Sequence, residues 1–472
     1  MMISGLNFRH RGGSVVACAV ALLLTACAPG QDTPTPTTGV DLTRYVAVGD
    51  SYTAGLSAGG LTRLGQEYSF PNLLAKQFQS ITSNAGFTQP LLEAGSGSGY
   101  FNLADFTTTG YARTRRVAGQ AVRGSVINPS ACGGPDTLRL LTRSATAAAL
   151  PQNLGVPGLL LSQIETAGLG NEANARPGIA FNPYFERLLP AADSRTYLQT
   201  VTTAVSSATF FTFFQGLDDF LPYVRSGGTC GTVPGSLTFG NLLRNNADKL
   251  LAVLAAGGRP GIIARLPSIT ALPLVGLGKG NVVEARLQAS FGDTARIYFE
   301  DPFGGAAARH ITDSDYILAT ALPRVGQLTA VTVGGSVRML PYGRHALNPL
   351  RNADVLENAT EMVRITGAIN SYNNALNDLA LKYKVAIVDP NSGSRTVSLD
   401  DVLFNQVAGV IFVNGVQYSS EPVRGNFYSL DYYTLTPRGN GLLANAFITA
   451  INRAYKANIP AIDVNKLPAT AQ

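Results

Sequence analysis

Short apolar or β-branched runs alternate along this chain with longer stretches whose apolar residues recur at helical spacing, and this alternation restricts the fold more than any other feature. The apolar runs are Arg44 to Val48, Ala208 to Phe214, Gly261 to Leu266 and Val385 to Val388. One intervening stretch carries an apolar face of Leu242, Leu243, Ala247, Leu250, Leu251 and Leu254 and would end at Gly257 and Gly258. Strands that alternate with helices favour a parallel sheet covered on both faces. We therefore predict an α/β fold.

The chain closes on a further predicted helix, which begins after Pro437 and Gly439. This gives a flavodoxin-like order of elements, with large loop insertions at Gly86 to Ala149 and Pro273 to Asn352 that carry no readable motif. Two predicted strands end in polar clusters, Gly49-Asp50-Ser51 and Gln215-Gly216-Leu217-Asp218-Asp219. In open α/β sheets, ligands bind beyond the carboxyl ends of the strands. We expect the functional site at these clusters.

The N-terminal segment has the layout of a secretory signal. Positive charge at Arg9 to Arg11 precedes the apolar run Val15 to Leu24, which is too short to span a membrane. Leu24-Thr25-Ala26-Cys27 resembles the lipobox of bacterial lipoproteins. This resemblance implies a signal peptide at 1–26 and acylation of Cys27, which would anchor an exported protein to a membrane of the cell envelope. An ordinary signal peptide with an incidental cysteine is the alternative.

The residues after Cys27 indicate a tether followed by one domain. Residues 27–40 are rich in Pro and Thr and carry too few apolar residues to fold. No second linker follows, so we predict a single domain over 41–472. Only 14% of the residues are charged, against roughly 25% in an average protein, and nothing indicates nucleic-acid binding. The basic cluster Arg113, Arg115, Arg116 and Arg123 is interpreted as a solvated loop, with a phosphate or anionic-lipid contact as the alternative.

Four cysteines occur in the chain. Cys18 lies in the predicted signal and Cys27 is the predicted acylation site. Cys132 and Cys230 remain as a possible disulfide in an oxidising compartment.

Four segments, in chain order, resemble the sequence blocks of the GDSL family of lipolytic enzymes, also called SGNH hydrolases. The segments are Ala47-Val48-Gly49-Asp50-Ser51-Tyr52-Thr53-Ala54-Gly55, Asn153-Leu154-Gly155-Val156-Pro157-Gly158, Gly216-Leu217-Asp218-Asp219 and Leu430-Asp431-Tyr432-Tyr433-Thr434-Leu435-Thr436-Pro437-Arg438-Gly439. Together they extend over most of the predicted domain. The resemblance implies the SGNH hydrolase fold.

The resemblance also implies acyl transfer, without a metal or a cofactor. Ser51 matches the nucleophile and Asp431 the carboxylate that orients the catalytic histidine. The N–H groups of Ser51 and Gly158, with a side chain at position 218, match the oxyanion hole. The implied substrates are esters of lipids or acylated glycans.

Two of the matching positions carry different chemistry from the family pattern. Asp218 stands where an Asn amide donates, so an ionised carboxylate would face the developing oxyanion; loss of such a donor costs about 10²- to 10³-fold. Thr434 stands where the catalytic histidine is expected, and a hydroxyl is a poor base at neutral pH. Substitute bases are His310, His345, or a carboxylate of Asp218 or Asp431 whose pKa is strongly raised.

Two hypotheses of different classes follow. The first is an envelope ester hydrolase that uses Ser51, Gly158 and Asp431. The second is a pseudoenzyme that binds a glycan or lipid in the same cleft without cleaving it. In the second case Ser51 would only cap a helix, and Asp219 and Asp431 would only brace loops. No motif specifies the substrate or the oligomeric state.

Overall fold

The computed structural model describes residues 39–82, 86–128, 136–145, 149–292, 294–300, 308–389 and 410–470, all within one compact unit, Pro36–Gln472. The predicted signal peptide, Cys27, most of the predicted tether and Cys132 lie outside the described residues. Among the described residues, no helix combines the length and the apolar character needed to cross a membrane.

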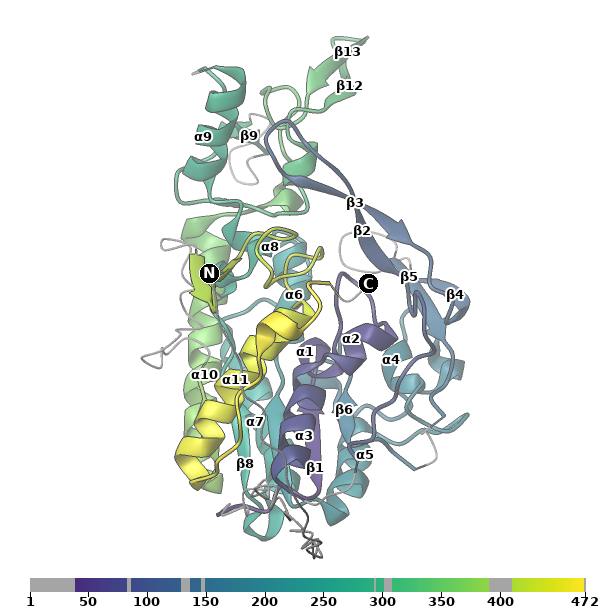
Figure 1. Cartoon of the computed structure of the whole chain (residues 1–472). Coiled ribbons are helices and arrows are strands. Elements are labelled where there is room, and N and C mark those ends of the chain that lie inside the picture. The colour runs from purple at the N-terminus through teal and green to yellow at the C-terminus, as the bar shows by residue number, and fades with distance from the viewer. Residues whose placement is uncertain are drawn as a thin grey trace, which may run out of the picture. The chain divides into compact units, whose positions relative to one another are not determined.

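A five-stranded parallel sheet forms the centre of this unit (Figure 1). Its strands, in spatial order, are β15 (Ala386–Val388), β8 (Gly261–Ala264), β7 (Phe210–Phe214), β1 (Tyr45–Gly49) and β6 (Asn153–Gly155). Every neighbouring pair is parallel. Counted along the chain, the spatial order is 2-1-3-4-5, the flavodoxin-like order, whose switch point lies between β1 and β7. The predicted α/β fold with a parallel sheet is confirmed.

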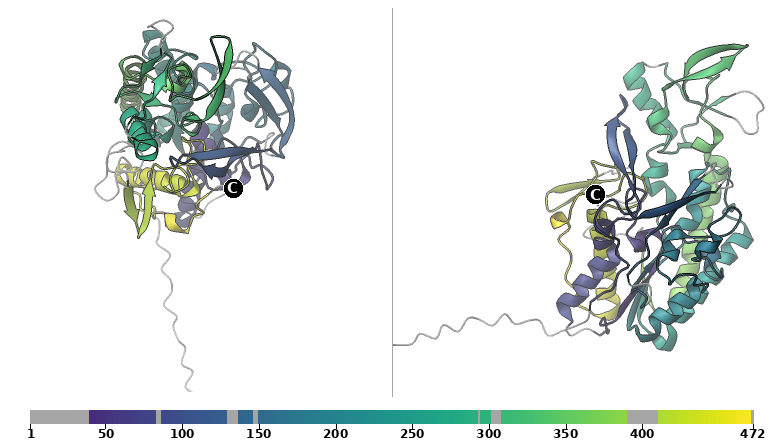
Figure 2. Two further views of the ribbon diagram at one scale, coloured as in Figure 1. Left: turned by 90° about the horizontal axis from the view of Figure 1, so that it is seen from above. Right: turned by 90° about the vertical axis from the view of Figure 1, so that its right-hand side faces the viewer.

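Helices cover both faces of the sheet (Figure 2). One face carries α3 (Phe70–Ile81) and α11 (Pro437–Tyr455), and the other carries α5 (Tyr197–Ala204), α7 (Leu237–Leu254) and α10 (Val363–Tyr383). The side chain of Thr436 accepts the Gly439 N–H, so α11 begins at Pro437, slightly before the predicted start after Gly439. The predicted apolar face of α7 is buried except for Leu242, which is exposed.

Shorter helices follow the strands or cross the insertions. They are α1 (Ser51–Ala54), α2 (Arg63–Glu67), α4 (Pro183–Glu186), α6 (Leu217–Arg225), α8 (Pro273–Gly276) and α9 (Gly280–Phe291). Helices α1 and α6 begin directly beyond the ends of β1 and β7.

Antiparallel strand pairs lie outside the central sheet, most of them in the insertions. The pairs are β2 (Tyr100–Phe106) with β3 (Ala112–Val117), β4 (Val122–Asn128) with β5 (Asp136–Leu141), β9 (Tyr298–Phe299) with β10 (Arg309–His310), β11 (Tyr316–Ile317) with β14 (Val355–Leu356), β12 (Leu328–Val333) with β13 (Ser336–Pro341), and β16 (Val410–Val413) with β17 (Val416–Ser419). The basic cluster interpreted as a loop instead lies on these strands. Arg113, Arg115 and Arg116 belong to β3 and Arg123 belongs to β4, because each strand has a partner whose backbone completes its hydrogen bonds.

Candidate active site

Ser51 lies at the switch point of the sheet, directly beyond the carboxyl end of β1. Its side chain is buried at 1% exposure. The preceding residue, Asp50, connects this turn to the neighbouring strand, because its Oδ2 accepts the backbone N–H groups of Gly216 (3.0 Å) and Asp218 (3.3 Å). The idea that Ser51 only caps a helix is wrong: Asp50 occupies the N-cap of α1, and the Ser51 hydroxyl donates elsewhere.

That donation goes to Asp218, which lies at the start of α6. Asp218 Oδ2 accepts three hydrogen bonds, from Ser51 Oγ at 2.6 Å, from Gly158 N at 2.7 Å and from Ser51 N at 3.2 Å. These two backbone donors are the pair expected to form an oxyanion hole. A carboxylate oxygen of the chain itself therefore occupies the position in which such a hole would hold a substrate oxygen.

Glycine at position 158 gives this arrangement its backbone shape. Gly158 has a φ of +71°, which places it in the left-handed region that residues with a Cβ adopt at a cost. An added Cβ would have ample room, since its nearest neighbour, Asn182 Nδ2, is 3.9 Å away. The requirement for glycine is therefore conformational. In this conformation the Gly158 N–H donates to Asp218.

Three buried carboxyl groups lie around this point, on Asp50, Asp218 and Asp219. Burial raises the pKa of Asp218 above its usual value, and the hydrogen bonds from Ser51 and Gly158 and the charge of Arg225 oppose the rise. Burial, then the nearby charge of Asp218, raises the pKa of Asp50 well above its usual value. Burial also raises the pKa of Asp219, and both oxygens of its carboxyl group accept the Leu161 N–H. Within the described residues, no group of three or more His, Cys, Asp or Glu side chains is arranged to hold a metal ion.

Tyr433 and Arg225 complete the surroundings of Ser51. Burial raises the pKa of Tyr433 above its usual value, whereas Arg225 and a hydrogen bond with Ser51 act in the opposite direction. The Arg225 guanidinium carbon lies 4.6 Å from the centre of the Tyr433 ring, within cation–π range. Among the described residues, no histidine lines this cleft, and besides Asp218 the Ser51 side chain bonds the Tyr433 phenol, whose pKa is raised.

Asp431 lines the same cleft, but both of its carboxylate oxygens accept hydrogen bonds from neighbouring residues of the chain. Its Oδ1 accepts from Ser429 Oγ (2.9 Å), Tyr433 N (3.2 Å) and Thr434 N (2.9 Å). Its Oδ2 accepts from Gly59 N (2.7 Å) and from the Thr434 hydroxyl. These bonds hold a turn in which Tyr432 has a φ of +67°, a strained value for an aromatic residue. Asp431 thus braces this loop.

Thr434 takes part in that brace and does not reach the cleft. It is fully buried, its hydroxyl lies 2.7 Å from Ser429 Oγ and also bonds Asp431, and it is not among the residues that line the cleft. Its hydroxyl is therefore engaged within the loop.

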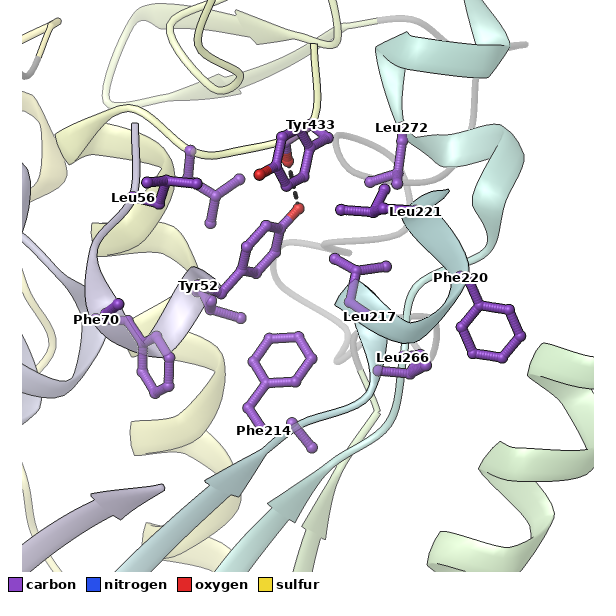
Figure 3. Close-up of a cluster of buried hydrophobic side chains, with 14 of the residues drawn as sticks. Tyr52, Leu56, Phe70, Phe214, Leu217, Phe220, Leu221, Leu266, Leu272 and Tyr433 are labelled. Carbon is purple, nitrogen blue, oxygen red and sulfur yellow. Dashed lines mark hydrogen bonds between the residues drawn. The ribbon is translucent and has the colours of Figure 1, made fainter. Parts of the chain in front are cut away.

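The loop that carries Tyr433 is fastened to α1 by Tyr52. The Tyr52 hydroxyl donates to the Tyr433 backbone carbonyl at 2.5 Å (Figure 3). Below this bond, the Tyr52 ring packs edge-on against Phe214 at the end of β7, with ring centres 5.5 Å apart. The apolar cluster under the site thus joins β7, α1 and the last loop.

The two histidines proposed as substitute bases lie elsewhere. His310 is exposed on β10, and its ring packs on Tyr298 with ring centres 4.3 Å apart. His345 Nδ1 accepts the Leu347 N–H within its own turn. Neither lines the cleft, so the prediction that one of them serves Ser51 has no support from their positions.

Cys230 is one of the two cysteines of the predicted disulfide, and it is disulfide-bonded. Because Cys132 lies outside the described residues, its pairing with Cys230 stays a prediction.

Ser51 and Asp218 lie on the floor of a cleft of about 830 Å³. Its walls come from the β2–β3 and β4–β5 hairpins, the loop after β6, α6, α8, the segment 320–327 and the loop 430–433. The volume falls within the usual range of small-molecule sites, about 300–1,000 Å³. Arg139, Arg225 and Tyr433 also line this cleft. Tyr433 belongs to the last of the four segments that resemble the family. Arg139 and Arg225 were not predicted, because their approach to Ser51 depends on tertiary contacts that no short motif reports.

A scan against protein-family models found no match, and searches of curated proteins and of solved structures also found none.

Proposed function

We propose that this protein is a non-catalytic binding protein built on the fold of the GDSL/SGNH hydrolases, exported and anchored to the cell envelope through acylated Cys27. Its ligand, a glycan or a lipid, would bind in the cleft above Ser51 without being cleaved. The assignment to the family is supported by the four sequence segments and by the strand order of the sheet.

The observation that carries the loss of catalysis is the position of Asp218. While its Oδ2 accepts the Ser51 and Gly158 N–H groups, neither group is available to donate to a substrate carbonyl oxygen. If Asp218 moved away to free them, Ser51 would lose the carboxylate that receives its hydroxyl proton. The same oxygen cannot both act as base and vacate the hole.

Asp431 and Thr434 support the same conclusion. The Thr434 hydroxyl bonds Asp431, the carboxylate that would otherwise orient a histidine in the family pattern. Removal of a triad base costs on the order of 10⁶-fold in rate in a well-studied serine protease.

An ester hydrolase that uses Asp218 as its base is the second candidate. It is favoured by one observation, the 2.6 Å hydrogen bond from Ser51 Oγ to a carboxylate whose pKa burial raises. A raised pKa makes a carboxylate a stronger base.

A fluorophosphonate probe separates the two candidates, because it labels an activated serine and requires a free oxyanion hole. We expect no labelling of the wild-type protein. The Asp218→Asn, Thr434→His double variant would be labelled if the two replacements caused the loss of activity, and Ser51→Ala in that background would abolish the label. Labelling of wild-type Ser51 would contradict the proposal and favour the second candidate.

A further inference from the structure

Within the part of the chain that the structure describes, the cleft is lined by five arginines and only two carboxylates, Asp218 and Asp431. The arginines are Arg113, Arg116, Arg139, Arg225 and Arg324. This is a high concentration of positive charge for a chain in which only 14% of the residues are charged and the net charge is +6. We propose that the ligand of this cleft is an acidic oligosaccharide, a short sugar chain that carries carboxylate or sulfate groups. The inference rests on the proposed binding function and names the class of its ligand.

The two carboxylates do little to repel such a ligand. Asp218 is 3% and Asp431 is 8% exposed, and backbone N–H groups donate to both. Hydrogen bonds of this kind spread and satisfy the negative charge below the surface. The charged groups that an incoming ligand meets are therefore mainly cationic.

Two of the arginines lie over aromatic rings. Arg225 lies over Tyr433 at 4.6 Å, and Arg116 lies over Phe101 at 5.4 Å from guanidinium carbon to ring centre. Both arginine side chains are exposed. Arg116 also bonds the Ser98 carbonyl at 3.4 Å, and Arg225 forms a hydrogen bond with Tyr433. Such contacts restrict the movement of a guanidinium, whose planar set of N–H groups suits binding of a carboxylate or sulfate.

The other three arginines differ in their ion pairs. Arg113 bonds Asp105 at 3.1 Å and Arg324 bonds Asp354, and both pairs are partly exposed. Arg139 on β5 forms no salt bridge with any carboxylate that the structure describes. Its charge is available to a ligand.

The accessible surface of the cleft combines charged, hydroxyl, aromatic and aliphatic groups. The large apolar side chains that are exposed among the described residues all lie outside the cleft lining. Groups accessible in the lining include Arg116, Arg225, Thr114, Thr137 and the half-buried side chains of Tyr184, Phe101, Leu138 and Leu160. Such a mixture of charged, hydroxyl and aromatic groups suits a polar ligand with ring faces.

The test is calorimetric titration of the full mature chain with oligomers of galacturonate, mannuronate and glucuronate, each beside its methyl ester of the same length. We expect at least one acid form to bind and its ester to bind at least about 10-fold more weakly. Added NaCl should weaken binding of the acid form. Esterification removes the charge and keeps the rings, so this comparison needs no variant.

Variants then locate the binding. Arg139→Gln and Arg225→Gln should each weaken binding of the acid form by about 10-fold. Arg115→Gln is the matched control, because Arg115 is exposed on β3 beside Arg116 but does not line the cleft, and it should change the affinity by less than about 2-fold. Circular dichroism checks that each variant is folded.

Equal affinity for acid and ester, or no binding of any acid form, would overturn the inference. Binding to vesicles of anionic phosphatidylglycerol in the absence of any oligosaccharide binding would also overturn it, in favour of a lipid. Failure of the proposed function is seen separately, as labelling of wild-type Ser51 by the fluorophosphonate probe.

Discussion

The hydroxyl of Ser51 donates a 2.6 Å hydrogen bond to Asp218 Oδ2, the same oxygen that accepts the N–H groups of Ser51 and Gly158. Both groups are buried. The stability of the protein should therefore depend on the protonation of this carboxyl group.

Asp218→Asn should change how stability varies with pH. Because the pKa of Asp218 is raised above 3.8, the folded state holds this proton more tightly than the unfolded state. The stabilising contribution of the protonated Asp218 carboxyl group is thus fully present below about pH 3.8 and is lost as the pH rises through the folded-state pKa. Relative to wild type, the variant should gain stability as the pH rises, by up to about 1.4 kcal/mol for each unit of the shift. Urea unfolding between about pH 4 and pH 7 measures this.

Asp248→Asn is the control of opposite sign. Although partial burial raises it, hydrogen bonds from Lys382 and Tyr383 bring the pKa of Asp248 below 3.8. Its contribution appears above that pH, so this variant should lose stability relative to wild type as the pH rises. The same trend in both variants would show that the carboxyl of Asp218 does not titrate as described.

Asp431→Asn should lower stability. The carboxylate accepts five hydrogen bonds, and an amide would turn N–H groups toward some of these donors. We expect the free energy of unfolding to fall by about 2–3 kcal/mol. Asp41→Asn, at an exposed residue with one local hydrogen bond, should change it by less than about 0.5 kcal/mol. A fully stable Asp431→Asn protein would argue against the bracing role.

Glu186→Gln should loosen the wall of the cleft that carries Arg139. Glu186 is fully buried and forms salt bridges with Arg123 on β4 and with Arg143 just beyond β5. Because both arginines are partly exposed, we expect a moderate loss of about 1–3 kcal/mol, together with weaker binding of acidic oligosaccharides. Glu172 bonds the same Arg123 but is 44% exposed, so Glu172→Gln should cost less than about 1 kcal/mol. Equal losses in the two variants would contradict this account.

Cys27→Ser should release the protein from membranes. If Cys27 is acylated as proposed, cells fed labelled palmitate should label the wild-type protein, and the variant should be unlabelled and appear in the soluble fraction. Cys18→Ser, within the predicted signal, is the control and should leave labelling intact. Labelled Cys27→Ser protein would exclude this site of acylation.

The sequence was informative wherever a local pattern determined structure. The all-buried runs at β1, β7 and β8 are continuous and apolar, so their strands were predictable to within a few residues. The predicted strand Ala208 to Phe214 begins two residues later because a 3₁₀ turn occupies Val205–Ser207. Strand β6 has only three residues, too few for a periodic pattern, and was seen only as part of a motif.

The site was predictable only in part, for a related reason. Ser51, Gly158 and Asp218 follow the ends of adjacent strands, so a parallel sheet brings them together. The engagement of Asp218 by both N–H groups depends on backbone angles that no motif specifies. The stacking of Arg225 on Tyr433 joins α6 to a loop some two hundred residues later, which only the folded chain reveals.

The central position of β1 has a consequence for how the chain reaches its native state. This strand comes first, yet it pairs with Asn153–Gly155 on one side and Phe210–Phe214 on the other. A chain that emerges N-terminus first cannot complete the middle of its sheet until Phe214 is available, and pairings of such long sequence separation close slowly. The turn bearing Ser51 is thus synthesised well before the two strands that flank it in the sheet.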